Sequence, residues 1–157
     1  MISSLPAQSL IYVDETGVDE CLYRDKCRSK RGVKVYGGIS GRKYKRTNIV
    51  AAQCCDKIIG PMEYNWTTDH HVFETWFEKV LLRQLPQGKT IIMDNASFHR
   101  KKVLWELAGE AKCEIIFLPA YSPDLNPIEK TWANLKSFLR NYVLRFDNVQ
   151  EDIKDFF

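Results

Sequence analysis

The first part of the chain consists of short apolar runs separated by turn residues. Apolar positions cluster over residues 9–14, 33–39, 47–55 and 58–64, and Gly, Thr-Gly or Asp-Lys pairs stand between them. Runs of this length, broken by turn residues, are typical of strands. We therefore predict that the chain begins with an antiparallel meander.

The spacing of apolar residues changes to that of a helix after Asp69. Asp69 is a suitable N-cap, and Pro86 and Gly88 are suitable helix stops. The apolar positions that recur at helical spacing between them are Val72, Phe73, Trp76, Phe77, Val80 and Leu81. This pattern predicts one amphipathic helix.

The rest of the chain alternates short strands with helices. The runs 90–93 and 114–118 are too short for helices and apolar enough to be buried strands. Helical patterns cover 99–111 and 126–142, and a last short helix is predicted from residue 148 to the end. Antiparallel strands followed by alternating helices and strands predict an α/β fold, in which helices cover both faces of a mixed sheet.

Three acidic residues stand at the ends of these elements. Asp14 ends the first apolar run, Asp94 ends the run after the first helix, and Glu129 lies in the first turn of the long helix. We expect the strands of Asp14 and Asp94 to lie side by side at the centre of the sheet, where α/β folds often bind ligands. Three converging carboxylates suit Mg²⁺, and metal pairs held in this way break and join phosphodiesters.

Each acid also has a purely structural interpretation. Asp14 and Asp94 can simply end strands and begin turns, because Asp favours both positions. Asn126, Pro127 and Glu129 have the spacing of a capping box, with Asn as the N-cap. These alternatives stay open when each acid is considered alone.

The neighbours of the three acids are less informative. Glu15 should point to the face opposite Asp14, because strand residues alternate, so we assign only Asp14 to the site. His99 follows Asp94 by five residues and could orient a phosphate, move a proton or pack the start of the next helix. The His70–His71 pair and His99 do not have the spacing of a zinc site.

Basic residues are concentrated in one segment. The net charge is only +3, yet ten basic residues stand against one acid between positions 24 and 46. Such a block is typical of a surface that binds nucleic acid, although a solvated basic loop is the alternative. The candidate DNA-binding residues are Arg24, Lys30, Arg31, Arg42, Lys43, Lys45 and Arg46.

The remaining features exclude several protein classes. Five cysteines without a CxxC pair fit neither a disulfide framework nor a zinc knuckle, and they indicate a reducing compartment. We find no signal peptide, no run long enough to span a membrane, and no glycine-rich phosphate loop. We therefore expect a cytoplasmic protein that does not bind ATP or a dinucleotide.

Three motifs together resemble the catalytic domain of DDE transposases of the mariner superfamily, in particular its bacterial insertion-sequence branch. They are Val13–Gly17 (VDETG), Met93–His99 (MDNASFH) and Leu118–Glu129 (LPAYSPDLNPIE). The 34 residues between the second and third acids are typical of that superfamily, and the stretch Gly41–Thr47 is also similar. The resemblance covers nearly the whole chain.

The resemblance implies a ribonuclease H-like fold with a mixed five-stranded sheet, formed by residues 1–157 as one domain. It implies that Asp14, Asp94 and Glu129 are the catalytic, metal-binding triad for two Mg²⁺ ions, with Mn²⁺ as a substitute. Asn95, His99 and Asn126 would support the triad. The implied reaction is hydrolysis at the ends of a mobile element and transfer of the 3′-hydroxyl to target DNA, usually at TA, a step that is easily deformed.

The resemblance also implies partners and leaves alternatives. Relatives act on double-stranded DNA as homodimers. Their helix-turn-helix recognition domains have no counterpart here, so a separate recognition chain is one of the partners that the resemblance suggests. The implied location is the bacterial nucleoid. A ribonuclease H-like nuclease without strand transfer, or a catalytically silent DNA-binding remnant of a truncated element, are the competing hypotheses.

Overall fold

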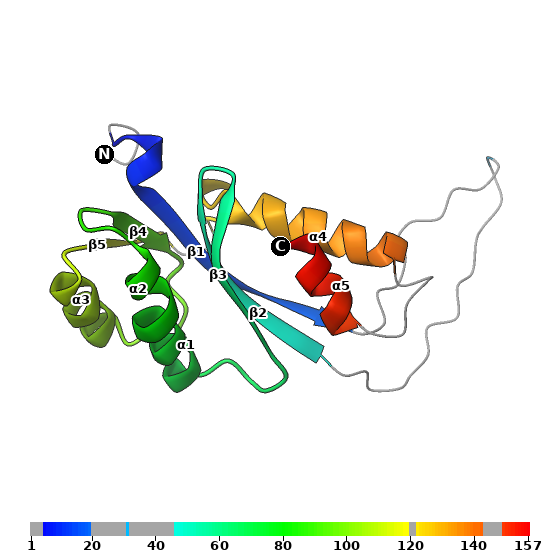
Figure 1. The fold of residues 1–157 in the computed structure, drawn as a ribbon, viewed down its shortest axis with the longest axis horizontal. Coiled ribbons are helices and arrows are strands. Elements are labelled where there is room, and N and C mark those ends of the chain that lie inside the picture. The colour runs from blue at the N-terminus through cyan, green and yellow to red at the C-terminus, as the bar shows by residue number, and fades with distance from the viewer. Residues whose placement is uncertain (1–4, 20–30, 32–45, 120–121, 143–148) are drawn as a thin grey trace.

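The computed structural model describes residues 5–19, 31, 46–119, 122–142 and 149–157. Its described part contains one sheet with strand order β3-β2-β1-β4-β5, in which β1, β2 and β3 are antiparallel and β1, β4 and β5 are parallel (Figure 1). The strands are β1 (Leu10–Asp19), β2 (Arg46–Cys54), β3 (Lys57–Tyr64), β4 (Thr90–Met93) and β5 (Glu114–Phe117). The helices are η2 (Ala7–Ser9), α1 (His70–Trp76), η3 (Phe77–Leu81), α2 (Leu82–Gln84), α3 (Lys101–Glu110), η4 (Pro123–Leu125), α4 (Ile128–Tyr142) and α5 (Val149–Phe156).

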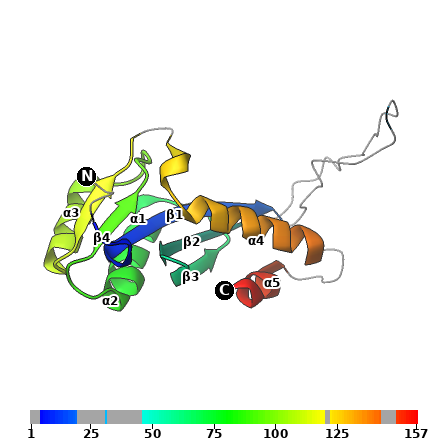
Figure 2. The same ribbon diagram turned by 90° about the horizontal axis from the view of Figure 1, so that it is seen from above.

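The predicted fold class is confirmed, with helices on both faces of the sheet. On one face Val13 and Val50 pack with residues of α1, η3 and α3. On the other face Val18, Ile49 and Ala51 pack with α4 and α5, and Figure 2 shows α4 running along β1. Strand residues alternate between these two cores because successive side chains point to opposite faces of a sheet.

Most predicted elements agree with the structure to within a few residues. Asp69 caps α1 by accepting a hydrogen bond from the Val72 backbone N–H at 2.9 Å, and α1, η3 and α2 together fill the predicted helix. Its middle, η3, is a π-helix. The predicted strand 33–39 lies outside the described residues. None of the described helices has the length and apolar character needed to cross a bilayer.

The first strand is longer than predicted, and this moves Asp14 from the end of the strand to its middle. Residues 15–19 continue the antiparallel ladder with β2, from Glu15 opposite Val50 to Asp19 opposite Arg46. The pair Thr16-Gly17 suggested a turn, but Thr16 and Val18 are buried by packing against distant parts of the chain. Tertiary burial here outweighs the local preference for a turn.

Asp14 nevertheless lies at the edge of the parallel part of the sheet. Strand β4 ends at Met93, which pairs with Val13. Asp14 is therefore the first residue of β1 beyond the end of β4, and Asp94 is its counterpart on the next strand. Strands β1 and β4 thus lie side by side at the centre of the sheet, as the sequence predicted.

Candidate metal-binding active site

Asp14 lies in β1 next to α4, and Asp94 directly follows the end of β4. The indole N–H of Trp132 donates a hydrogen bond to Asp14 Oδ2 at 3.0 Å. Glu129 lies three residues earlier on the same helix, so it shares that helix face. The charges of Glu129 and Asp94 both act on Asp14, which is half-buried, whereas Asp94 and Glu129 are exposed.

The electrostatics of Asp14 show how crowded these carboxylates are. Burial raises the pKa of Asp14 most, and the charges of Glu15, Glu129 and Asp94 raise it further, to about 7. A carboxylate that is shielded from water and close to other carboxylates strongly favours binding a proton or a cation. This donor set of hard oxygens with excess negative charge fits a divalent cation such as Mg²⁺ or Mn²⁺.

Glu15 has its own neighbours on the other face of β1. Glu15 does point to the opposite face of β1, but there Glu15 Oε1 lies 3.4 Å from His99 Nε2. Donor atoms of Glu15, Asp94 and His99 lie within 4.8 Å of one another. Burial is the main reason that the pKa of Glu15 is raised.

His99 joins the two faces of the site. Its ring is buried between Phe73 and Phe98, with centroid distances of 4.3 and 4.4 Å. Its Nδ1 makes no hydrogen bond to any described residue but lies 3.5 Å from Asp94 Oδ1. Of the alternatives for His99, the packing role is observed, and the ring also lies close to the Asp94 and Glu15 carboxylates.

The loop that carries Asp94 and His99 is fixed at several points. Asp94 Oδ1 accepts a hydrogen bond from the Ala96 backbone N–H at 3.1 Å, and the His99 N–H donates to Ala96 O at 3.1 Å. Arg100 then forms a two-point ion pair with Glu74 on α1, with its Nε donating to Glu74 Oε1 at 2.7 Å. The loop is therefore fixed by its own hydrogen bonds and attached to α1 through Arg100.

The two asparagines have different surroundings. Asn95 is exposed in the loop after β4. Asn126 is buried, and its side chain donates a hydrogen bond to the Val13 carbonyl at 3.4 Å instead of capping α4. Its Oδ1 has no partner among the described residues. The Asn126 half of the predicted capping box is therefore wrong, because a tertiary contact with β1 competes for the side chain.

The structure describes two of the seven basic candidates. Arg31 and Arg46 are exposed, and Arg46 begins β2. The other five lie outside the described residues: Arg24, Lys30, Arg42, Lys43 and Lys45.

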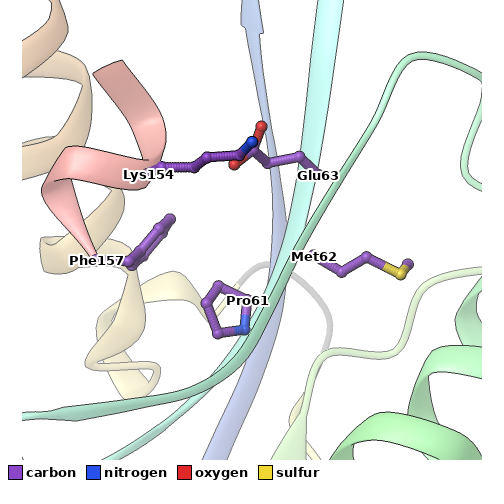
Figure 3. A pocket seen from close by; sticks show the side chains of 5 residues that line it. All are labelled: Pro61, Met62, Glu63, Lys154 and Phe157. Carbon is purple, nitrogen blue, oxygen red and sulfur yellow. The ribbon is translucent and has the colours of Figure 1, made fainter. Parts of the chain in front are cut away.

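A separate hollow of about 580 Å³ lies between β3 and the C-terminal helix (Figure 3). Pro61, Met62, Glu63, Lys154 and Phe157 line it. Burial raises the pKa of Glu63 although the charge of Lys154 opposes the shift. This hollow contains none of the clustered carboxylates, so it is not part of the candidate metal site.

Comparisons with known proteins agree with this architecture. The family model of the DDE superfamily endonucleases matches residues 9–151. No significant relative is found among curated proteins. Among solved structures, the Mos1 strand transfer complex matches with a TM-score of 0.70 at 20% identity, over 95% of this chain and 46% of that one.

Two further structures share the fold. The Mos1 transposase catalytic domain with raltegravir and Mg has a TM-score of 0.60 at 16% identity, over 94% of this chain and 68% of that one. A simian T-cell lymphotropic virus intasome in complex with a PP2A regulatory subunit, B56 gamma, has a TM-score of 0.63 at 11% identity, over 95% of this chain and 46% of that one. The chain thus spans about half the length of the Mos1 chain in the strand transfer complex. It belongs to the DDE superfamily of endonucleases, and its ribonuclease H-like fold is that of the mariner transposase catalytic domain.

Proposed function

We propose that this chain is the catalytic domain of a DNA transposase, which hydrolyses phosphodiesters at the ends of a mobile element and transfers the freed 3′-hydroxyl to target DNA. The observation that carries the proposal is the group of Asp14, Asp94 and Glu129. Burial raises the pKa of Asp14 most, and the nearby charges of Glu15, Glu129 and Asp94 raise it further, to about 7. Such a cluster has a clear use in an endonuclease family, where hard cations bind phosphate and carboxylate oxygens together.

Asp14, Asp94 and Glu129 would hold two Mg²⁺ ions, with Mn²⁺ able to substitute. When bound, such ions activate the attacking oxygen and stabilise the leaving oxygen of an in-line displacement. The solved Mos1 paired-end complexes with Mn and with Mg support this choice of metals. Each carboxylate comes from a different element, so the fold itself sets the spacing of the ligands.

The neighbouring side chains orient these ligands. Trp132 hydrogen-bonds one oxygen of Asp14, which fixes the carboxylate's rotation and leaves its other oxygen available. His99 stands between Glu15 and Asp94, and the rings of Phe73 and Phe98 pack against it and hold it in place. Asn126 ties the start of α4 to β1 and so holds Glu129's helix above Asp14. Polar groups of this kind matter because ligands must be positioned before the reaction begins.

The substrate would be double-stranded DNA, bound as element ends and as target. The basic segment between residues 24 and 46 supports this, since lysine and arginine side chains neutralise phosphates. We further propose a homodimer, TA target sites, and recognition of element ends by a domain or chain outside these 157 residues. The bacterial nucleoid is the proposed location. The Mos1 complexes contain paired ends and strand-transfer products, which supports the reaction by analogy.

The test is a Mn²⁺-dependent nicking and joining assay on supercoiled DNA. We expect activity from the parent chain and a loss of about a hundred-fold or more in Asp94→Asn and Glu129→Gln, since each removes a charged metal ligand. Asp124→Asn, an exposed acid in η4, is the matched control and should keep full activity.

Three outcomes separate the competing functions. Nicked and joined products that need Asp94 and Glu129 support the transposase. Nicking without joining, even with pre-cleaved element ends as donor, favours a nuclease. Metal-independent DNA binding that Asp94→Asn leaves unchanged, with no cleavage by the parent, would indicate a silent remnant.

A further inference from the structure

Trp66 is an exposed indole in an otherwise well-anchored loop. Its relative exposure is 60%, although a residue of this size is usually mostly buried. Its carbonyl accepts a hydrogen bond from Asn48 Nδ2 at 2.7 Å, and its ring is tilted against Tyr64 with 5.6 Å between centroids. The backbone is thus fixed while much of the indole faces solvent. Such an arrangement suits a ring that contacts a binding partner.

The indole borders a polar hollow of about 560 Å³. Its other lining residues are Arg46, Asn48, Asn65, Thr67 and Thr68. A volume of this size falls in the usual range for sites that hold one small ligand. One aromatic surface, one positive charge and several amide and hydroxyl groups therefore converge on the same space.

Gly17 makes room for the positive charge. A Cβ atom at Gly17 would lie 2.1 Å from Arg46 Nη2, so the guanidinium occupies the space that a side chain would fill. Arg46 Nε also donates to Asn48 Oδ1 at 3.3 Å. Asn48 in turn holds the Trp66 carbonyl, so a chain of contacts links the guanidinium to the loop of the indole.

The hollow lies next to the carboxylate site along the same strands. Glu15 pairs with Val50, and Gly17 pairs with Asn48, so Glu15 and the hollow share one face of the β1–β2 ladder. Gly17 is two positions after Glu15 along the strand, which is a distance of about 7 Å. Figure 1 shows β1 and β2 continuing side by side past the end of β4. DNA that reaches the carboxylates can therefore also reach this hollow.

We propose that the hollow binds one unpaired nucleotide of the DNA substrate, with its base stacked on Trp66 and its phosphate on Arg46. The inference rests on the proposed function, which makes DNA the substrate. An indole stacks on any base because every base has a π-face, and a guanidinium matches the geometry of a phosphate. A base inside a duplex cannot offer its face, so the site selects a nucleotide that has left the stack.

The test compares two DNAs that differ only in unpaired bases. One is a blunt duplex, and the other is the same duplex with a two-nucleotide 3′ overhang that contains 2-aminopurine. Binding is measured by anisotropy of a distal dye in Ca²⁺ buffer without Mg²⁺ or Mn²⁺, and stacking by 2-aminopurine fluorescence. We expect the parent to prefer the overhang about ten-fold, as one stacked base implies, with a fluorescence change on binding.

Variants of two exposed tryptophans test whether the preference depends on Trp66. Trp66→Ala should lose the preference and the fluorescence change while binding the blunt duplex as the parent does, and Trp66→Phe should keep part of both. Trp105→Ala is the matched control, because Trp105 is 52% exposed on α3 and packs against Phe117 at a different place. Thermal melting confirms that each variant is folded.

Each other result overturns the inference. If the parent binds both DNAs equally, or if Trp66→Ala weakens both equally, the hollow does not select an unpaired base. If the parent binds duplex DNA and cleaves it without any overhang preference, only this inference fails. If the parent binds neither DNA, the proposed function fails with it.

Discussion

At the scale of single residues, the shifted pKa of Asp14 is the most informative feature. Burial and the charges of Glu15, Glu129 and Asp94 raise its pKa from 3.8 to about 7. A folded-state pKa above the unfolded one means that the protonated form is favoured by folding. The stability contributed by that proton is fully present below pH 3.8 and is lost as the pH rises through about 7.

We therefore expect metal-free protein to lose stability between about pH 5 and about pH 8, by on the order of a few kcal/mol. Asp14→Asn cannot ionise at this position, so it should remove most of that loss. Urea unfolding in EDTA at the two pH values measures the effect. Equal pH dependence in the parent and in Asp14→Asn would contradict the crowding of carboxylates described above.

Trp132 gives a second prediction at this scale. Trp132→Phe keeps most of the apolar packing of α4 but removes the hydrogen bond to Asp14 Oδ2. We expect the rate of Mn²⁺-dependent nicking to fall by about ten-fold, which corresponds to a hydrogen bond to a charged group. Trp105→Phe is the control, since that ring lies outside the site. A Trp132→Phe rate equal to the parent's would show that the carboxylate does not need this donor.

At the scale of elements, the β1–β2 ladder connects the site to the proposed nucleotide hollow. Gly17→Ala should push the Arg46 guanidinium away, because the new Cβ would overlap it, while a flexible side chain can move without unfolding the strand. We expect weaker DNA binding and a smaller dependence on salt, since about one phosphate contact is lost. Affinity measured at several salt concentrations provides the test.

Gly109→Ala is the matched control for this prediction. A Cβ at Gly109 meets nothing within 4 Å, and the residue lies within α3, so alanine should raise stability by roughly 0.5–1 kcal/mol and leave DNA binding unchanged. If Gly17→Ala and Gly109→Ala give the same salt slope as the parent, Arg46 does not contact phosphate from its observed position.

At the scale of the whole molecule, the sequence predicted the architecture better than the boundaries of the individual strands and helices. Alternation and helical spacing indicated an α/β sheet covered on both faces, and that is observed because burial sets both patterns. The end of β1 was wrong because Thr16 and Val18 are buried by elements distant in the chain. Local signals do not contain such contacts.

The candidate site was likewise predictable only in part. Asp14, Asp94 and Glu129 were proposed because each stands at the end or the start of an apolar or helical pattern in the sequence, although β1 continues past Asp14 in the structure. Glu15 was not assigned to the site because strand alternation places it on the face opposite Asp14, and the sequence pattern does not show that its donor atoms lie near those of Asp94 and His99. Trp66 stands in a short loop without a motif, and its exposure depends on packing that the sequence pattern does not reveal.

The length of β1 has a consequence for how this enzyme family can diversify. Five of the ladder pairs between β1 and β2 lie beyond Asp14, from Glu15 opposite Val50 to Asp19 opposite Arg46. Those pairs act as a rigid spacer between the carboxylates and whatever peptide joins the two strands. That peptide can therefore change in length or composition without shifting the reacting groups. Engineers could exchange it between relatives to alter which DNA is bound, while the chemistry stays intact.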